Sequence, residues 1–201
     1  KSILNMAFTD AEIDKIIKFN PIPTIRTPKV QRKKKKPTIS PLEQQQLIEI
    51  LLSETNGLCY IFIMNTGVRP GENGGMKWKH YSYEDANVKV RDNYGKVTYY
   101  DDNFEKIESK FEEKDLKTPS SYRNIPLQKW LNNMMYAYMQ YIMEQRGYTK
   151  KEQLDDEYIF MNSLGHALSS DYLWDTLDKI LKRHNFKHLS VYQLRHLFAT
   201  R

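Results

Sequence analysis

The sequence predicts an α+β domain that is mostly α-helical and carries a small antiparallel sheet. Apolar residues recur at helical spacing on both sides of residues 83–126, whereas that central stretch contains the strand-like segments "ANVKV", "KVTYY" and "YRNIPL". No internal repeat and no glycine-rich phosphate loop is evident. A chain of 201 residues is long enough for one domain with a substantial core and a flanking piece.

The chain is predicted to have three parts. Residues 1–20 contain a helix, opened by a capping box from Thr9 to Glu12, and a lone helix cannot bury its own apolar face. They are therefore interpreted as the end of a domain that is mostly absent here. Residues 21–37 hold four prolines and a basic cluster, which is typical of a linker. Residues 38–201 form the main domain.

The main domain is expected to open with a helix, because Ser40, Pro41 and Glu43 have the pattern of a capped start. Asn56-Gly57 is expected to end that helix, and an apolar run follows to Asn65.

The middle and the end of the domain are assigned in the same way. A turn is predicted at residues 93–95, and residues 101–116 are interpreted as an insertion within the sheet. Helices are expected over residues 127–147 and from Ser169 through Lys182, with "DEYIFMN" as a short strand between them. A Ser-x-x-Gln cap at Ser190 opens the closing helix.

Charge and cysteine usage narrow the class of protein. The formal net charge is +6, and residues 26–36, "RTPKVQRKKKK", contain basic side chains and no acid, so the basicity belongs to one segment. The single cysteine, Cys59, excludes a disulfide within the chain. No Cys/His cluster indicates a metal, and neither a membrane span nor a signal peptide is evident. We expect a cytoplasmic protein without metal or cofactor.

Three short segments contain the candidate functional residues: "NTGVRPGE" (65–72), "LKTPSSYRNIPL" (116–127) and "VYQLRHLFATR" (191–201). Taken singly, two of these residues have a purely structural explanation. Arg69 could be a surface arginine in a tight turn, and Lys117 could be a lysine at the edge of a strand. Arg195 is different, because Leu194 and Leu197 mark its helix as buried. An arginine there requires an anionic partner.

Taken together, the three segments resemble the signatures of the tyrosine recombinase (phage integrase) family, T-G-x-R-x-x-E, K-T-x-x-S-x-R-x-I-P-L and H-x-L-R-H-x-F-A-T. The matching positions are Thr66, Gly67, Arg69 and Glu72, then Lys117, Thr118, Ser121, Arg123 and Ile125-Pro126-Leu127, then Leu194-Arg195-His196 and Phe198-Ala199-Thr200. The resemblance implies the fold of a tyrosine recombinase catalytic domain over residues 38–201. It also implies that residues 1–20 are the last helix of a core-binding domain.

Phosphoryl-transfer chemistry explains the arginines. Cleavage of DNA by an oxygen nucleophile passes through a phosphorane with extra negative charge, which guanidinium groups bind bidentately while staying charged. Arg69 and Arg195 suit that role. The resemblance implies that Lys117 protonates the leaving 5′ oxygen, a reaction open to a desolvated lysine. Glu72 is expected to orient the arginines, or to be a first-turn carboxylate favoured by the helix dipole.

The main departure from the family pattern is Tyr192, where the family most often has histidine. A phenol can donate a hydrogen bond to phosphate but is a poor base, given a reference pKa of about 10. His196 is a candidate to share the role, with a packed helix histidine as its alternative. The family's nucleophilic tyrosine follows this motif, so none is expected within the chain. We therefore expect an incomplete and inactive fragment.

The leading interpretation is a site-specific recombinase, an integrase that cleaves and rejoins double-stranded DNA through a 3′-phosphotyrosine, as a homotetramer on paired sites when complete. The alternatives are a non-catalytic DNA-binding or regulatory module and a type IB topoisomerase-like enzyme. No membrane and no metal are involved. The basic linker is expected to contact DNA phosphates through Arg26, Lys29, Arg32, Lys33, Lys34, Lys35 and Lys36.

Overall fold

The computed structural model describes residues 2–26, 39–116 and 118–199. It divides into two compact units, Lys1–Pro37 and Thr38–Arg201, which are described separately.

The first unit consists of helix α1 (Ser2–Ile13) and a 3₁₀ turn, η1 (Ile22–Thr24). The expectation that Thr9 caps this helix is wrong. Thr9 lies inside α1, where its hydroxyl donates to the carbonyl of Asn5 at 2.7 Å. Asn20 then ties the following segment back, because its side-chain amide donates to Thr9 Oγ1 at 2.9 Å. The helix has no buried residue within the described chain.

The helices of the second unit begin where their caps predict. Ser40 and Glu43 form a reciprocal capping box at the start of α2, and Ser169 caps α6. Ser190 and Gln193 make the same exchange at α7, with distances of 2.9 and 3.2 Å. The helices are α2 (Pro41–Leu52), α3 (Gly57–Thr66), α4 (Pro70–Gly75), α5 (Lys129–Arg146), α6 (Ser170–Arg183) and α7 (Val191–Ala199), and the 3₁₀ turns are η2 (Trp78–His80), η3 (Pro119–Ser121) and η4 (Lys151–Leu154).

The expectation that Asn56-Gly57 ends α2 is wrong, because α2 ends at Leu52 and Gly57 begins α3. A Cβ at this position would lie 1.5 Å from the carbonyl oxygen of Leu51, so only glycine allows the end of α2 to approach α3 so closely.

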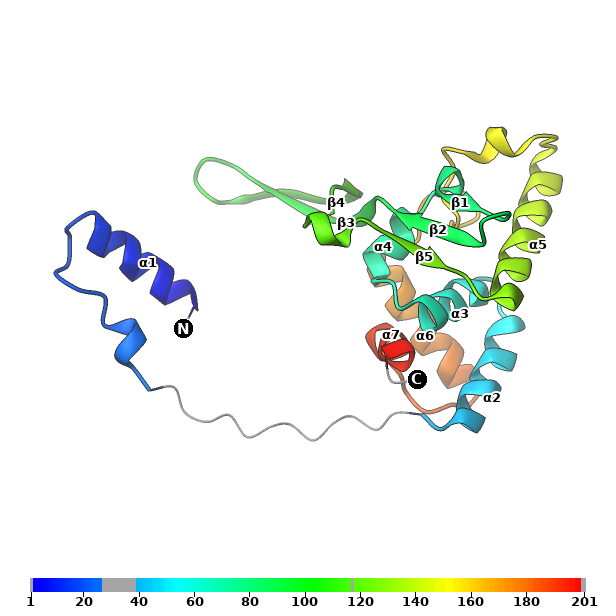
Figure 1. Cartoon of the computed structure of the whole chain (residues 1–201), viewed down its shortest axis with the longest axis horizontal. Coiled ribbons are helices and arrows are strands. Elements are labelled where there is room, and N and C mark those ends of the chain that lie inside the picture. The colour runs from blue at the N-terminus through cyan, green and yellow to red at the C-terminus, as the bar shows by residue number, and fades with distance from the viewer. Residues whose placement is uncertain (1, 27–38, 117, 200–201) are drawn as a thin grey trace. The chain divides into compact units, whose positions relative to one another are not determined.

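The strands form two antiparallel sheets. One has the order β1 (Tyr81–Ser82), β2 (Asn87–Val90), β5 (Arg123–Pro126), with Val90 opposite Arg123. Strands β3 (Asn93–Tyr100) and β4 (Lys106–Lys114) form a separate hairpin whose far end extends away from the helices (Figure 1).

One sequence prediction about this region is wrong, because residues 93–95 begin β3 and form no turn. Residues 101–116 do belong to an insertion between the paired strands β2 and β5, as predicted, and they contain the whole of β4. The charge-rich β4 lacks apolar alternation because all of its residues are exposed or only half-buried. The segment "DEYIFMN" is also no strand, since it contributes only isolated bridges at Tyr158 and Met161.

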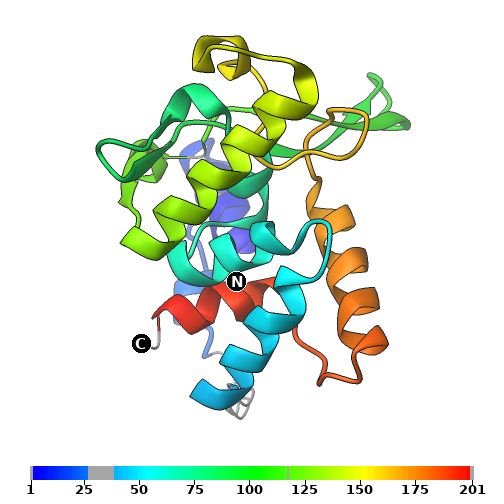
Figure 2. The ribbon, with the colours of Figure 1, turned by 90° about the vertical axis from the view of Figure 1, so that its right-hand side faces the viewer.

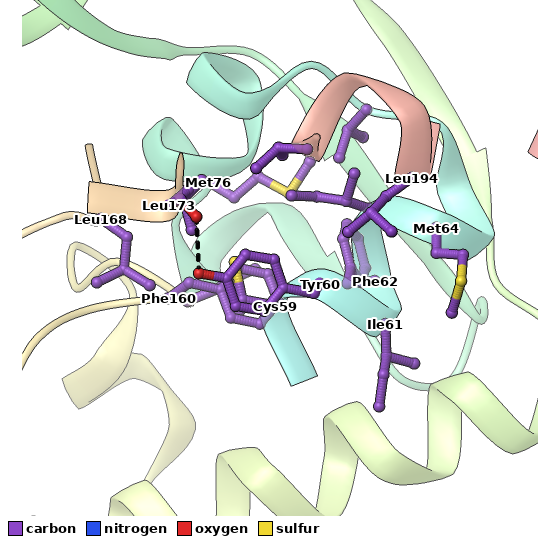
Figure 3. Close-up of a cluster of buried hydrophobic side chains, with 14 of the residues drawn as sticks. Cys59, Tyr60, Ile61, Phe62, Met64, Met76, Phe160, Leu168, Leu173 and Leu194 are labelled. Carbon is purple, nitrogen blue, oxygen red and sulfur yellow. Dashed lines mark hydrogen bonds between the residues drawn. The ribbon is translucent and has the colours of Figure 1, made fainter. Parts of the chain in front are cut away.

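Helix α3 lies at the centre of the second unit. Residues Cys59 to Met64 are at most 2% exposed, so the helix is apolar on every side. Figure 3 shows Cys59, Tyr60 and Phe62 grouped with Met76, Phe160 and Leu194, and the Tyr60 hydroxyl donates to the carbonyl of Leu173 at 3.0 Å. Helix α7 lies beside α3 (Figure 2) and buries Val191, Leu194 and Leu197 there.

Two glycines allow helix α4 to pack closely against its neighbours. A Cβ at Gly74 would lie 2.5 Å from the carbonyl oxygen of Leu168, and one at Gly75 would lie 2.9 Å from the backbone nitrogen of Asn93. Alanine would suit an isolated helix better at both positions. The two glycines therefore serve the close approach of α4 to β3 and to the segment before α6.

Candidate active site

Arg69 lies in the turn between α3 and α4, and its neighbours fix that turn. Gly67 ends α3 with a φ of 64°, in the left-handed region. Pro70 begins α4 and requires an extended residue before it, which Arg69 is, at φ −74° and ψ 150°. A Cβ on Gly67 would lie 2.5 Å from the ring of Phe198, so this glycine also lets the turn approach α7.

Glu72, in the first turn of α4, is a buried carboxylate with 2% of its side chain exposed. It accepts hydrogen bonds from the backbone N–H of Arg69 at 2.9 Å and from Arg69 Nη1 at 2.5 Å. Arg123, at the start of β5, donates to both carboxylate oxygens, at 3.2 and 2.7 Å. Burial opposes ionisation, but the hydrogen bonds from Arg123 and Arg69 outweigh it and hold the pKa of Glu72 below its ordinary value.

Arg195 projects from α7 toward the same group of charges. Its Nη1 is buried and has no hydrogen-bond partner within the described part of the chain. Burial lowers the pKa of Arg195 from its ordinary value, and the charges of Arg69 and Arg123 act in the same direction while Glu72 opposes them. The guanidinium stays protonated at neutral pH all the same. A buried, charged donor without a protein acceptor fits an anionic ligand.

Arg69 and Arg195, far apart in sequence, line one pocket of about 500 Å³. Arg123 lines it too, together with Thr66, Gly67, Thr118, Ser121, His196, Phe198 and Ala199. A second pocket of about 500 Å³ adjoins it and shares Arg69, Thr118 and Ser121. We call the first the arginine pocket and the second the adjoining pocket. Three guanidinium groups facing one carboxylate give the arginine pocket an excess of positive charge, which suits a phosphate group.

Comparison with known proteins identifies the family. The sequence profile described as "Phage integrase family" matches residues 37–201. The chain belongs to the phage integrase family.

A curated relative, "Tyrosine recombinase XerC-like" of Caldanaerobacter subterraneus subsp. tengcongensis, is 27% identical over 169 residues, covering 82% of this chain and 42% of the relative. The Tn1549 transposon integrase in complex with transposon right end DNA has a TM-score of 0.72 at 18% identity, over 98% of this chain and 62% of that chain. XerA recombinase has a TM-score of 0.59 at 17% identity, over 84% and 51%. The fold is that of these recombinases, and the chain spans about half the length of such relatives.

Tyr192 and His196, the other two candidate residues of the last motif, lie at different pockets. Tyr192 lines the adjoining pocket with Arg69, and its half-exposed ring lies 5.9 Å from that of Trp174. It does not line the arginine pocket, whereas the exposed His196 does. Lys117 lies outside the described residues. Its neighbours Leu116 and Thr118 both border the adjoining pocket.

Sequence reasoning missed Arg123 as a site residue. Its position was recognised only as part of the integrase motif around β5. The available signal is an arginine at the first residue of a short strand, two positions after Ser121. Its partner, Glu72, is fifty-one positions away in the sequence and is brought close only by the packing of α4 near β5.

The predicted DNA-binding linker lies almost entirely outside the described residues. Arg26 is described and exposed, whereas the other six basic residues fall within residues 27–38. Within the described chain, no group of His, Cys, Asp and Glu side chains is arranged to hold a metal ion. The described helices include none long and apolar enough to cross a membrane.

Proposed function

We propose that the protein is a site-specific DNA recombinase that cleaves and rejoins double-stranded DNA through a 3′-phosphotyrosine intermediate. The observation that carries the proposal is the arginine pocket, where Arg69 and Arg195 meet and where the buried Nη1 of Arg195 has no protein acceptor in the described chain. A scissile phosphate is the anion that two such groups would bind in an enzyme of this family.

In the proposed reaction, a tyrosine hydroxyl loses its proton and attacks the scissile phosphorus. A bond forms between the tyrosine oxygen and the 3′ phosphate, and the bond to the 5′ oxygen breaks. The two guanidinium groups bind the non-bridging oxygens, whose charge grows in the transition state. Each such fixed donor contributes about 2.7–4 kcal/mol. Rejoining reverses the steps, with a 5′ hydroxyl attacking the phosphotyrosine.

Lys117 is assigned as the general acid that gives the leaving 5′ oxygen its proton. Two described residues, Leu116 before it and Thr118 after it, border the adjoining pocket together with Arg69, which supports this assignment. Tyr192 is assigned as a hydrogen-bond donor to phosphate, and His196 as a second candidate for that role. The nucleophile is assigned to a tyrosine outside residues 1–201.

The partners follow from the same proposal. Double-stranded DNA is the substrate, the complete protein acts as a homotetramer on paired sites, and the site of action is the cytoplasm. Residues 1–20 belong to the end of a core-binding domain, and residues 21–37 are a linker along the DNA backbone. DNA complexes among the similar structures, such as XerH bound to its difH substrate, support DNA as the partner.

The test is covalent trapping on a nicked suicide substrate, followed by denaturing gel electrophoresis. The natural full-length protein should form a protein–DNA adduct. Arg69→Lys and Arg195→Lys should each slow its formation by about 10²- to 10³-fold, since lysine keeps the charge but loses the bidentate geometry. Adduct formation at the wild-type rate in both variants would refute the arginine assignment.

The same experiment separates cleavage from mere binding. Residues 1–201 alone should bind the substrate and form no adduct, and Tyr192→Phe in the full-length protein should still form one. An adduct on the short chain that disappears in Tyr192→Phe would make Tyr192 the nucleophile. Tight binding without any adduct, even for the full-length protein, would favour a non-catalytic module.

A further inference from the structure

Arg123 has the most extensive contact with Glu72 of any side chain in the described structure. It uses two nitrogens, Nη1 and Nη2, on both carboxylate oxygens, and Nη1 also donates to the carbonyl of Ser121 at 3.1 Å. About 31% of its side chain is exposed, against 2% for Glu72. The pair is therefore a bidentate ion pair that covers one side of a buried carboxylate.

Arg69 contacts the same carboxylate in a different way. One nitrogen, Nη1, reaches Glu72 Oε1 at 2.5 Å, while 51% of the Arg69 side chain stays exposed to solvent. Glu72 thus orients Arg69 through a single guanidinium nitrogen. The other nitrogens of Arg69 are the ones that can turn to a phosphate oxygen.

The surroundings of Glu72 provide few other cations. The charged and titratable groups that face it or line the pockets beside it come from four directions: Arg69 from its own turn, Arg123 from β5, Arg195, Tyr192 and His196 from α7, and Tyr94 and Asp115 from the hairpin and the segment after it. Among the described residues, Arg69 and Arg195 are the cations that would remain near the buried charge of Glu72 without Arg123.

We propose that Arg123 is a positioning residue of the active site, which neutralises Glu72 and so leaves Arg69 and Arg195 available to the substrate phosphate. This inference rests on the proposed recombinase function. Removing one partner of a buried ion pair leaves an uncompensated charge, which is costly. In the absence of Arg123, Glu72 would take a second hydrogen bond from the guanidinium of Arg69 and withdraw that guanidinium from the pocket. Arg123 itself need not touch the substrate.

The test is a double-mutant cycle in the natural full-length protein, with variants Arg123→Met, Glu72→Gln and both together. Single-turnover cleavage of the suicide substrate should fall by about 10²-fold in Arg123→Met, the lower end of the range for losing a preorganised donor, because Arg69 is withdrawn from the phosphate. It should fall by only about tenfold in Glu72→Gln, because the amide still accepts a hydrogen bond from Arg69. The double variant should resemble Glu72→Gln alone, because the neutral amide no longer competes for Arg69. Because neutralising Glu72 would also relieve a loss of stability, the cleavage rates are compared at a temperature where circular dichroism shows every variant to be folded.

DNA affinity and two controls complete the design. The dissociation constant for DNA should change less than about threefold in Arg123→Met, because few of the phosphate contacts are lost. Arg91→Met is the matched control: Arg91 also hydrogen-bonds β5, at Asn124 Oδ1 and the carbonyl of Arg123, but has no hydrogen bond to Glu72. It should cleave at nearly the wild-type rate. Arg123→Lys, which keeps the charge, is the second variant in case Arg123→Met fails to fold. Its cleavage rate should lie between those of the wild type and Arg123→Met.

The outcomes are distinguishable from failure of the proposed function. If Arg69→Lys and Arg195→Lys abolish cleavage while Arg123→Met and Arg123→Lys cleave normally, the positioning role is refuted and the recombinase assignment stands. Multiplicative losses in the double variant would also refute it, since they would show that Arg123 acts independently of Glu72. If the two lysine variants cleave normally, the proposed function itself fails.

Discussion

Glu72 keeps its negative charge where water is almost excluded, with 2% of its side chain exposed. Had Arg69 been its sole partner, the carboxylate and a phosphate would compete for one guanidinium. Arg123 changes that balance, because it satisfies both carboxylate oxygens from the other side. The positive excess of the arginine pocket is therefore set by a residue that the motif-based assignment of catalytic roles leaves out.

The remaining residue-scale prediction concerns Lys117. Lys117→Ala in the full-length protein should slow cleavage by about 10²- to 10⁴-fold, the usual contribution of a general acid. Cleavage should recover on a substrate whose leaving 5′ oxygen is replaced by sulfur, because a thiolate leaves without a proton. Single-turnover cleavage of the two substrates gives the comparison.

The control for Lys117 is Lys110→Ala, a change to a half-exposed lysine on β4, which should affect neither substrate. If Lys117→Ala cleaves both substrates equally slowly, the lysine positions the phosphate and donates no proton.

The sequence predicts those parts of the site that depend on residues close together in the chain. Arg69 and Glu72 are three positions apart and meet within one turn, and Arg195 follows from an arginine on a buried helix face. Arg123 depends on the packing of β5 near α4, for which no local pattern exists. The place of Tyr192 in the adjoining pocket likewise depends on how α7 is rotated against α3.

At the scale of elements, a prediction for α4 concerns the sign of the change in the free energy of unfolding when Gly75 is replaced. Gly75→Ala should stabilise a free helix by up to about 1 kcal/mol. Here the new Cβ would lie 2.9 Å from the backbone of Asp92 and Asn93, which cannot yield as a flexible side chain can. We therefore expect the free energy of unfolding to fall by about 1–3 kcal/mol, as in other overpacked interiors. Urea denaturation followed by circular dichroism measures it.

Gly95→Ala is the matched control for Gly75→Ala. Its new Cβ would meet only the side chains of Asn93 and Lys114, at 3.2 Å and beyond, so the free energy of unfolding should change by less than about 0.5 kcal/mol. A Gly75→Ala protein as stable as the wild type would mean that α4 and β3 separate easily. The glycines would then not be what holds the two elements at their distance.

The elements that the sequence predicts best are the helices that begin with a capping residue. The caps at Ser40, Ser169 and Ser190 mark helix starts because each side chain satisfies a free backbone N–H. The β3–β4 hairpin has no such signal. Its strands carry charges on both faces, and the Asn-Tyr-Gly sequence that indicates a turn instead begins β3, where Gly71 of α4 approaches Asn93.

At the scale of the whole molecule, the arginine pocket draws on segments from both ends and the middle of the second unit. The α3–α4 turn gives Arg69, β5 gives Arg123 and α7 gives Arg195, and α3 is packed against α7 through the core. The order of the three motifs along the chain could be recognised from sequence. Their convergence is a property of the core, because the buried faces of α3 and α7 fix the distance between the first and the third motif.

The last prediction concerns the basic linker and is based on the sequence alone. Replacing Lys33–Lys36 with glutamine removes four positive charges from the segment that the proposal places along DNA. Each lost phosphate contact should reduce the slope of log affinity against log salt by about 0.9, so the slope should fall by up to about 3–4. Affinity should drop by a similar factor for every DNA sequence, because phosphates carry no base information.

Fluorescence anisotropy with specific and scrambled duplexes at several salt concentrations measures both quantities. The matched control replaces the same four lysines with arginine, which keeps the charge and should keep the salt slope. A loss confined to the specific duplex would mean that the segment reads bases. An unchanged slope in the glutamine variant would mean that these lysines remain solvated beside the DNA, and the DNA-binding role would then rest on the second unit alone.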